Sequence, residues 1–279
     1  MQDGISYTET PNAPVEGVWL PAWDGELYAA NTGHHRVHDE WFRASLPLRP
    51  TDRLLDLGCG AGDFTRTIAD QLAHGDVVGL DSQPSLLAEA RHRAGPNQTF
   101  IEGPVQALST LLPTPADFDV VMSRSAMHWV PVRDHPRLLR DVHRLLRPGG
   151  WFRLEMGGVG NIPVILPVLN EVSLEFGGPT SPWTFPDPAV YLELLEAAGF
   201  SAEGGHVQAV AQRRGFDREA LRGWLHSQCL QAFEMGLPAE RHRAFRAAAE
   251  ARLDDMRRHD ATFDQTFVRL DVLVRRPPT

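Results

Sequence analysis

The 279-residue sequence contains no lysine, so all 27 of its basic residues are arginines. A GC-rich genome would account for this bias without any functional cause. The chemical consequence is firm, because no Schiff-base lysine, P-loop lysine or lysine general base can exist in this chain. Enzyme classes that depend on those groups are therefore excluded.

Cysteine is also scarce, with only Cys59 and Cys229 in the chain. Two cysteines cannot build a disulfide framework or a cysteine-rich metal site. The first residues carry neither the basic nor the apolar stretch of a secretory signal peptide. No run of the sequence approaches the ~20 apolar residues of a membrane-spanning helix. We therefore expect a reduced, cytoplasmic protein with no membrane partner.

Positive charge is outweighed by negative charge, and the formal net charge is −9. A surface that binds nucleic acid or an acidic membrane needs a positive field, which this balance disfavours. We therefore expect no nucleic-acid partner and a small-molecule substrate. The chain is expected to act as a monomer or a homodimer.

From residue 53 onward, short apolar runs alternate with segments of helical periodicity. Such alternation is typical of right-handed βαβ units in a parallel, doubly wound, Rossmann-like α/β sheet. Ligands of these sheets bind beyond the carboxyl ends of the strands. Strands are predicted at 53–57, 76–80, 99–101, 118–122 and 151–156, and helices at 63–73, 84–93 and 137–146, the last of these ending at the turn 148–150.

This rhythm changes on either side of the core. We expect an N-terminal arm at 1–50, with a helix at 33–46 that covers the cofactor, and a cofactor-binding core at 51–156. Residues 157–279 are expected to complete the sheet. They contain predicted strands at 206–212 and 265–274, a helix at 191–198, and helical segments at about 160–185 and 217–258 that form a lid over the ligand edge.

A glycine-rich loop lies between the first predicted strand and the following helix. Gly58, Gly60 and Gly62 allow the backbone to turn tightly and to approach a ligand without Cβ interference. Asp81, at the end of the next strand, follows Gly62 by 19 residues. A carboxylate at that place accepts hydrogen bonds from the two ribose hydroxyls of a nucleotide. The alternative is an ordinary strand-to-helix turn in which Asp81 caps a helix.

The spacing of this loop discriminates between nucleotides. Dinucleotide sites favour G-x-G-x-x-G, whereas this chain has G-x-G-x-G, preceded by Asp56. A carboxylate at Asp56 would repel a pyrophosphate but attract an ammonium or sulfonium group. S-adenosyl-L-methionine (SAM) carries both cations, so the loop favours SAM.

Residues 51–156 resemble the catalytic core of class I SAM-dependent methyltransferases. Their first motif is matched by Asp56–Gly62, their second by Asp81, their fourth strand by Phe118–Ser123, and the turn before their fifth strand by Leu145–Gly150. The resemblance implies a seven-stranded sheet whose last strand is antiparallel. It also implies SAM as the cofactor and S-adenosyl-L-homocysteine as its product.

The resemblance assigns a role to each part of the cofactor site. Asp56 and the loop residues Gly58, Cys59, Gly60 and Gly62 are expected near the methionine part of SAM, and Asp81 with Ser82 near the ribose. The family often has an acid where this chain has Pro104, so backbone groups of 104–106, including those of Pro104 and Val105, are expected to contact the adenine. Ser123 is expected to face the cofactor. Tyr28, in the N-terminal arm, is expected either to cover SAM or to be an ordinary buried tyrosine.

Beyond the core, the sequence resembles the trans-aconitate methyltransferase branch of the family. The resemblance rests on Pro182–Pro186, Leu195–Phe200, Val268–Pro277, and Trp129 within Met127–Pro131. Proteins of this general shape also methylate natural products of secondary metabolism, so the branch leaves the acceptor open.

Methyl transfer from a sulfonium is an in-line displacement that depends mainly on positioning. A base is needed only for a hydroxyl, amine or carbon acceptor. His128 follows the fourth strand, where the acceptor should lie, and is predicted as the catalytic base, with packing as the alternative. Glu155, at the end of the fifth strand, is a weaker candidate, for which a salt bridge is the more usual role.

The acceptor pocket is expected to be lined by Trp129, Trp183 and Trp224, with Phe185 and Phe233 as further aromatic candidates, although such residues are more often core. Arginines bind carboxylates through paired hydrogen bonds. Arg124 is our candidate for such a clamp, whereas Arg36 and Arg213 are interpreted as surface residues.

The group His34, His35, His38 and Asp39 invites a metal interpretation, but it offers no third ligand on one helix face, so we expect no metal. The leading hypothesis is therefore O-methylation of a carboxylate or hydroxyl. The alternatives are N- or C-methylation of a natural product, non-methyl SAM chemistry such as cyclisation, and a catalytically silent binding module. Arsenic methylation is disfavoured because the required cysteines are missing, and protein or RNA methylation by the acidic charge and the expected lid.

Overall fold

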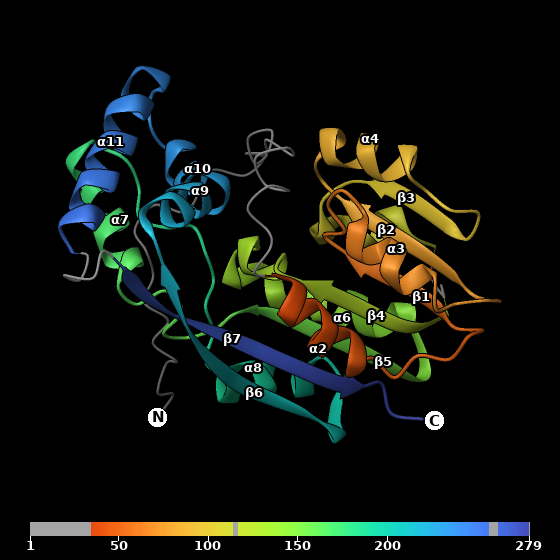
Figure 1. Cartoon of the computed structure of the whole chain (residues 1–279). Helices are drawn as coiled ribbons and strands as arrows, with labels where there is room; N and C mark the ends of the chain where they lie inside the picture. Colours follow the sequence, from red (N-terminus) through yellow and green to blue (C-terminus); the bar gives the residue numbers. More distant parts are fainter. Residues whose placement is uncertain (1–34, 114–116, 257–261, 279) are drawn as a thin grey trace, which may run out of the picture.

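The computed structural model describes residues 35–113, 117–256 and 262–278. Its centre is a seven-stranded sheet of order β3-β2-β1-β4-β5-β7-β6, in which β7 is antiparallel to both of its neighbours (Figure 1). The α/β class and the reversed last strand are therefore confirmed. The strands are β1 (Arg53–Leu57), β2 (Asp76–Asp81), β3 (Gln98–Glu102), β4 (Phe118–Arg124), β5 (Leu146–Gly157), β6 (Ser201–Phe216) and β7 (Phe263–Arg275).

Helices cover both faces of this sheet, which explains why its central strands are apolar on both sides. In β1, Leu54, Leu55 and Leu57 are all fully buried. Leu54 packs with α2 (His35–Ala44) and α3 (Asp63–Ala69) on one face. Leu55 and Leu57 pack on the other face with α6 (His135–Leu145) and α8 (Pro188–Ala197). On the α3 side, α4 (Pro84–His92) contacts β3 and β2.

The helices begin and end largely where local signals predict. Proline occupies the first turn of α4, α6 and α8, where its missing N–H costs no hydrogen bond. The Asp187 carboxylate caps α8 by accepting from the Ala189 N–H at 2.8 Å. Further helices are η1 (Val105–Ala107), α5 (Leu108–Leu111), η2 (Met127–Trp129), η3 (Val132–Asp134) and α7 (Ile165–Glu175).

The predicted start of the fifth strand is wrong. We expected a turn at 148–150 and a strand from 151, but β5 begins at Leu146. Leu146 pairs with Phe118 before a register shift, and the Gly149 N–H donates to the Arg276 carbonyl at 2.9 Å. Gly149 also has φ +78°. The glycines therefore form an irregular part of β5 that is held by the backbone of Arg276, instead of a free turn.

The β6–β7 ladder extends beyond the rest of the sheet and carries a separate helical part. The last residue of β5, Gly157, is in register with Arg269, whereas β7 continues outward to Phe263, which pairs with Phe216. Between these two phenylalanines lie α9 (Arg218–Gln228), α10 (Leu230–Glu234) and α11 (Ala239–Asp255). The single helical stretch predicted at 217–258 is therefore wrong in detail, because the chain breaks around Cys229 and again at 236–238.

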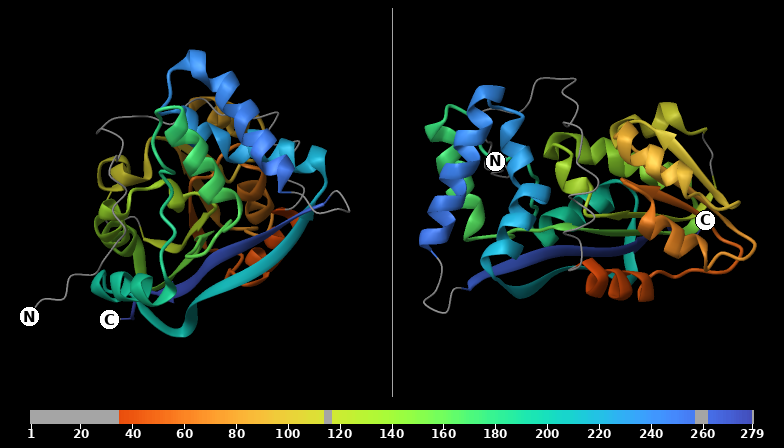
Figure 2. Two further views of the ribbon diagram at one scale, coloured as in Figure 1. Left: turned by 90° about the vertical axis from the view of Figure 1, so that its left-hand side faces the viewer. Right: turned by 45° about the horizontal axis from the view of Figure 1, so that its top comes forward.

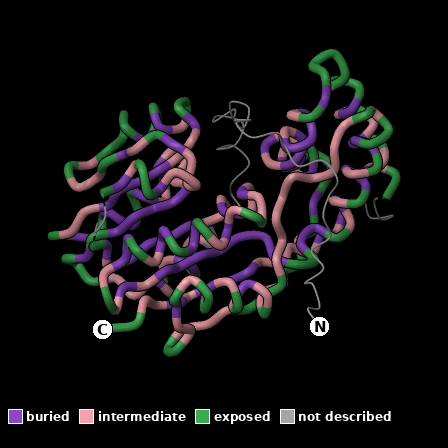
Figure 3. Tube along the Cα trace, turned by 180° about the vertical axis from the view of Figure 1, so that it is seen from behind, coloured by how far each residue is buried: buried purple, intermediate pink, exposed green. Residues whose placement is uncertain are grey.

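These three helices and α7 share a core of their own, which we call the lid core. Figure 2 shows α7 beside α11, and the two helices contact each other. The lid core includes Trp224, Phe233 and Phe245, all buried. In Figure 3 the buried residues follow the strands and the inner sides of these helices. None of the helices in the described part of the chain has the length and apolarity that a membrane crossing requires. The domain boundaries at 50 and 156 stay a prediction.

A buried ion pair between β5 and β7 attaches α2 to the sheet. Arg153 and Asp271 are both fully buried, with 2.5 Å between Nη1 and Oδ1. Arg153 also donates from Nε to the Ser45 hydroxyl at 2.9 Å and lies over the Phe42 ring, 4.3 Å from its centroid. A buried guanidinium needs such partners to offset its desolvation. This network therefore fixes the position of α2 on the sheet.

Candidate cofactor and acceptor site

The glycine-rich loop lies at the carboxyl end of β1, directly before α3. Gly58, Gly60 and Gly62 all have positive φ, at +77°, +55° and +78°. A Cβ on Gly58 would lie 2.2 Å from the Cβ of Ala126, so this glycine allows close packing against the end of β4. A Cβ on Gly60 would meet no atom within 4 Å. The backbone at Gly60 therefore faces open space, as close approach to a ligand requires.

Asp81 links this loop to the end of β2. Its Oδ2 accepts from the Gly60 N–H at 2.8 Å and its Oδ1 from the Gln83 N–H at 2.9 Å. The bond from Gln83 forms a turn ahead of α4, whose N-cap is Gln83 and not Asp81. Burial raises the pKa of Asp81, and the backbone N–H groups of Gln83, Gly60 and Ser82 oppose that rise. Each oxygen keeps a second lone pair, which two hydroxyl groups of a ribose can use.

Asp56 is a buried carboxylate in β1, only 3% exposed. Its Oδ2 accepts from the Thr65 hydroxyl at 2.7 Å. Burial raises the pKa of Asp56 to about 6, against the lowering effects of the Thr65 hydrogen bond and of Arg124. The negative charge of Asp81 adds to the rise. A carboxylate in such surroundings is poorly compensated by the protein itself, which is typical of a functional position.

The adenine edge follows β3. Gly103 has φ +155°, and a Cβ there would lie 2.5 Å from Leu111. Pro104 then leads into the short helix η1, whose first-turn N–H groups, at Val105 and Gln106, have no partner within the helix. These donors lie where the resemblance expects backbone contacts to an adenine.

Beside the loop, the end of β4 is more constrained than the sequence suggests. The Ser123 side chain is fully buried, and its hydroxyl donates to the Leu57 carbonyl at 2.8 Å. Arg124 forms an ion pair with Asp39 of α2 and lies over the Phe64 ring, 4.5 Å from its centroid. Contact of Ser123 with the cofactor and of Arg124 with the acceptor stay predictions, and both side chains already have protein partners.

Ser125, Glu155 and Arg269 form a polar cluster where β4, β5 and β7 meet. Ser125 has φ +54°, a sparsely populated conformation for a residue with a side chain. Arg269 forms an ion pair with Glu155 and donates from Nη2 to the Ser125 hydroxyl oxygen at 2.7 Å. The Ser125 N–H donates to the Glu155 carbonyl at 2.8 Å. The cluster holds the strained residue in place at the carboxyl end of the sheet.

His128 lies next to this cluster. The Gly157 N–H donates to its Nδ1 at 3.4 Å, so the neutral ring carries its proton on Nε2. Burial lowers the pKa of His128 to about 3, with a further lowering by Arg269 that Glu155 opposes. A base works best when its pKa is near the working pH. The geometry therefore favours a hydrogen-bond donor over the catalytic base predicted from the sequence.

Three half-buried aromatic residues, Trp129, Trp183 and Phe185, lie beside His128, and we call them the aromatic wall. The Trp183 ring stacks on Phe185 at 5.9 Å and meets Trp129 edge-on at 5.5 Å between centroids. The Phe185 ring lies 6.1 Å from that of His128. The Thr184 N–H donates to the His128 carbonyl at 2.8 Å, which fixes the wall against the end of β4.

The core of the sheet matches a family model described as a methyltransferase domain, over residues 54–150. An uncharacterized methyltransferase of Schizosaccharomyces pombe is 32% identical over 211 residues, which cover 73% of this chain and 78% of that protein. The chain belongs to the class I SAM-dependent methyltransferase family.

Two further comparisons add to this result. A trans-aconitate 2-methyltransferase of Deinococcus radiodurans is 35% identical to this methyltransferase over 166 residues, 56% of this chain and 61% of that protein. The crystal structure of the YcgJ protein from Bacillus subtilis superposes with a TM-score of 0.58 at 17% identity, over 88% of this chain and all (100%) of that one. The second comparison shows the fold alone.

The remaining predicted site residues of the methyltransferase lie in different places. Trp224 is buried in the lid core against Phe216 and Phe267. This burial does not support the predicted contact of Trp224 with the acceptor, which stays a prediction. Tyr28 and His34 lie outside the described residues, as do the side chains of His35 and His38. Among the side chains that the structure describes, no three His, Cys, Asp or Glu residues are arranged to hold a metal ion.

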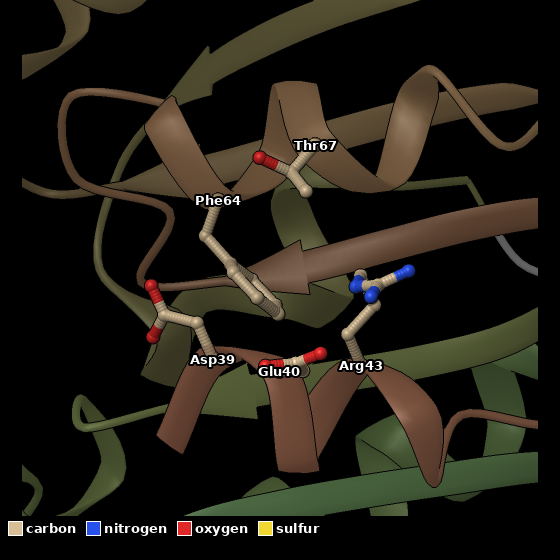
Figure 4. A pocket seen from close by; sticks show the side chains of 5 residues that line it. All are labelled: Asp39, Glu40, Arg43, Phe64 and Thr67. Carbon is tan, nitrogen blue, oxygen red and sulfur yellow. The ribbon is translucent and has the colours of Figure 1, made fainter. Parts of the chain in front are cut away.

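A surface pocket lies between α2 and α3. Asp39, Glu40 and Arg43 of α2 face Phe64 and Thr67 of α3 across it (Figure 4). Phe64 points from α3 into this gap. Asp39 is also the partner of Arg124, so the pocket lies beside the contact that joins α2 to the end of β4. It is a gap in helix packing on one face of the sheet.

The polar cluster is the part of the site that the sequence left incomplete. Glu155 was predicted only as a weaker base candidate, and Arg269 only as part of a stretch that carries the family resemblance. The sequence could have indicated that Glu155 and Arg269 lie close together, because both lie where predicted strands reach the ligand edge of the sheet. Their pairing depends on the antiparallel register of β5 and β7.

The glycine loop yields a paired prediction. Gly58→Ala should lower the free energy of unfolding by about 3 kcal/mol, because it adds a clash with Ala126 to an unfavourable φ. Gly60→Ala should cost only about 1 kcal/mol, because its Cβ has space, but should weaken SAM binding more than tenfold. Urea unfolding and calorimetric titration with SAM measure the two effects. Equal stability of the two variants would show that Gly58 does not serve packing.

Proposed function

We propose that this methyltransferase transfers the methyl group of SAM to a carboxylate oxygen of a small acid. The observation that carries the proposal is the hydrogen bond that sets the position of the proton on the His128 ring. Its Nδ1 accepts from the Gly157 N–H, so the ring presents an N–H donor at the acceptor edge. A donor suits an oxygen that is already negatively charged.

The residues present fit SAM at the carboxyl ends of β1, β2 and β3. Gly60 leaves room for a ligand against the loop, Asp81 retains lone pairs for a ribose, and Val105 offers an N–H to an adenine. Asp56 supplies a buried negative charge that suits a cationic methionine moiety. SAM supplies, when bound, a methyl group on a cationic sulfur.

Deprotonation of the acceptor finds little support in this site. His128 has a pKa of about 3 and therefore attracts a proton weakly at neutral pH. Glu155 is held in an ion pair by Arg269. A carboxylate is ionised at neutral pH and needs no base, whereas a hydroxyl, amine or carbon acceptor does. The trans-aconitate methyltransferases among the relatives support the same choice.

His128 variants test this role. His128→Phe should lower kcat/KM about 10- to 100-fold, because a hydrogen bond to a charged group is lost. His128→Gln should retain most of the activity, because its amide N–H replaces the donor. The kcat of the wild type at saturating SAM should stay constant between pH 7 and 8.5, since His128 is neutral and Asp56 is ionised throughout. The product should be a methyl ester that mild alkali hydrolyses.

A tenfold rise of kcat through a pKa near 6.5 would contradict the donor role and restore His128 as a base. An alkali-stable ether or amine product would contradict carboxylate methylation itself.

A further inference from the structure

The charges near His128 cancel each other. The two charged groups that act on it are Arg269 and Glu155, which form an ion pair with one another. Arg269 also donates a hydrogen bond to the Ser125 hydroxyl oxygen. At the end of β4, Arg124 is paired with Asp39. The described part of the acceptor edge therefore supplies no uncompensated guanidinium for an acceptor that carries several carboxylates.

Arg214 is a cation of a different kind. It lies over the Phe216 ring, 4.2 Å from its centroid, and burial lowers its pKa. In the β6–β7 ladder, Arg269 pairs with Val210, four residues before Arg214. Four residues along a strand correspond to about 13 Å. Arg214 therefore belongs to the base of the lid and not to the surroundings of His128.

The first 34 residues of the predicted N-terminal arm contain no arginine or lysine. They contain five acidic residues: Asp3, Glu9, Glu16, Asp24 and Glu26. Four arginines of the lid helices are engaged with carboxylates as well, and Arg243 is exposed on α11. Arg218, Arg222, Arg246 and Arg252 form ion pairs with Asp254, Glu250, Glu234 and Glu175, respectively. Among the described residues around His128, no unpaired cation is left to receive the additional charges of a polycarboxylate, and Arg214, whose Nη1 has no partner, lies at the base of the lid.

The aromatic wall offers an apolar contact surface instead of charge. Trp129, Trp183 and Phe185 are half-buried, whereas Phe233 behind Trp183 is fully buried. Partly open aromatic faces beside a few polar groups are typical of sites for flat, apolar ligands. The indole nitrogen of Trp183 is buried and has no hydrogen-bond partner among the described residues. It is a free donor within an otherwise apolar surface.

We propose that the acceptor is a monocarboxylic acid with a flat, apolar body, and not a polycarboxylate. This inference rests on the carboxylate methylation proposed above. His128 donates to the single carboxylate, and the aromatic wall contacts the body of the acid. The compensated pair Glu155–Arg269 discriminates against further carboxylates, because a second anionic group would face Glu155 without a free cation.

A panel of acids tests the inference. Cinnamate and trans-aconitate are both unsaturated acids, but the first carries one carboxylate and a phenyl ring, and the second carries three carboxylates. With indole-3-acetate, octanoate and citrate, they allow kcat/KM to be compared across charge and shape. The best monocarboxylate should exceed trans-aconitate at least tenfold. Quenching of tryptophan fluorescence measures binding of the same acids independently of turnover.

Two variants separate the wall from the charge pair. Trp183→Leu should raise KM for the preferred aromatic acid about tenfold with little change in kcat. Trp41→Leu is the matched control for loss of an indole away from the wall, because Trp41 is 39% exposed on α2. The Trp41 ring centroid lies 5.0 Å from the Arg153 guanidinium, so folding of this variant is checked first. Glu155→Gln leaves Arg269 without its carboxylate, so it should raise the ratio of kcat/KM for trans-aconitate over cinnamate at least tenfold. Thermal unfolding checks that each variant is folded.

The outcomes distinguish this inference from the proposed function. If trans-aconitate is methylated as well as every monocarboxylate, the inference is wrong and carboxylate methylation stands. If Glu155→Gln lowers that ratio, the charge argument fails. If no acid yields a methyl ester while calorimetry shows SAM binding, the proposed function itself is wrong.

Discussion

An Asp56→Asn variant is expected to be more stable than the wild type at pH 8 and yet to bind SAM at least tenfold more weakly. Burial raises the pKa of Asp56 from 3.8 to about 6. The folded protein therefore binds this proton more tightly than the unfolded chain does. The resulting stability is present below pH 3.8 and is lost as the pH rises through 6. Above pH 6 the ionised group costs about 3 kcal/mol.

Asparagine removes this cost and keeps an oxygen that can accept from Thr65. The gain in free energy of unfolding should therefore be about 3 kcal/mol at pH 8 and about half of that at pH 5, where the folded group is largely protonated but the unfolded group is already ionised. Asp70→Asn, an exposed acid at the end of α3, is the control. Thermal unfolding at both pH values and calorimetric titration with SAM measure the two effects. Unchanged SAM affinity would mean that Asp56 serves the fold alone.

Loss of the Asp81 carboxylate is expected to weaken SAM binding at least 100-fold. Each carboxylate oxygen offers a lone pair to a ribose hydroxyl, and a hydrogen bond to a charged group contributes about 1.5–3 kcal/mol. Asp81→Ala also leaves the Gly60 and Gln83 N–H groups without their acceptor. The glycine loop then loses part of its support in addition to the contact itself.

Asp76→Ala is the matched control for this variant. Asp76 begins the same strand, has a half-exposed side chain and pairs with Arg53 at 3.3 Å, at the end of β2 opposite Asp81. It should bind SAM as the wild type does in calorimetry. A loss of SAM affinity of less than threefold in Asp81→Ala would leave that carboxylate with the role of supporting the loop and the turn before α4 only.

Most of the sheet could be predicted from the sequence because its signals are local. The apolar run at 53–57 coincides with β1, and the helical spacing of Leu138, Leu139, Val142 and Leu145 gives the buried face of α6. The predicted strand at 206–212 reached only part of β6, which runs from 201 to 216. β6 is an edge strand paired by β7 alone, and many of its residues are exposed, so it lacks the apolar pattern of a central strand.

The candidate site likewise has a part that local sequence motifs predict and a part that depends on long-range contacts. The glycine loop and Asp81 form a contiguous motif with a fixed spacing, so the sequence predicts their proximity. Glu155 and Arg269 are 114 residues apart, and they meet only because of the register between β5 and β7. The proton position on His128 depends on the backbone of Gly157, 29 residues away. Such long-range contacts leave no local pattern from which a role could be inferred.

The attachment of α9, α10 and α11 has a consequence for how such enzymes diverge. The chain leaves the sheet after Phe216 and returns at Phe263, and these two residues face each other across the ladder. An insert whose two ends meet at one rung can be lengthened, shortened or exchanged while the strands that hold Asp56 and Asp81 keep their register. Evolution can therefore exchange α9, α10 and α11, including Phe233 behind Trp183, while the strands that carry the glycine loop and Asp81 stay unchanged.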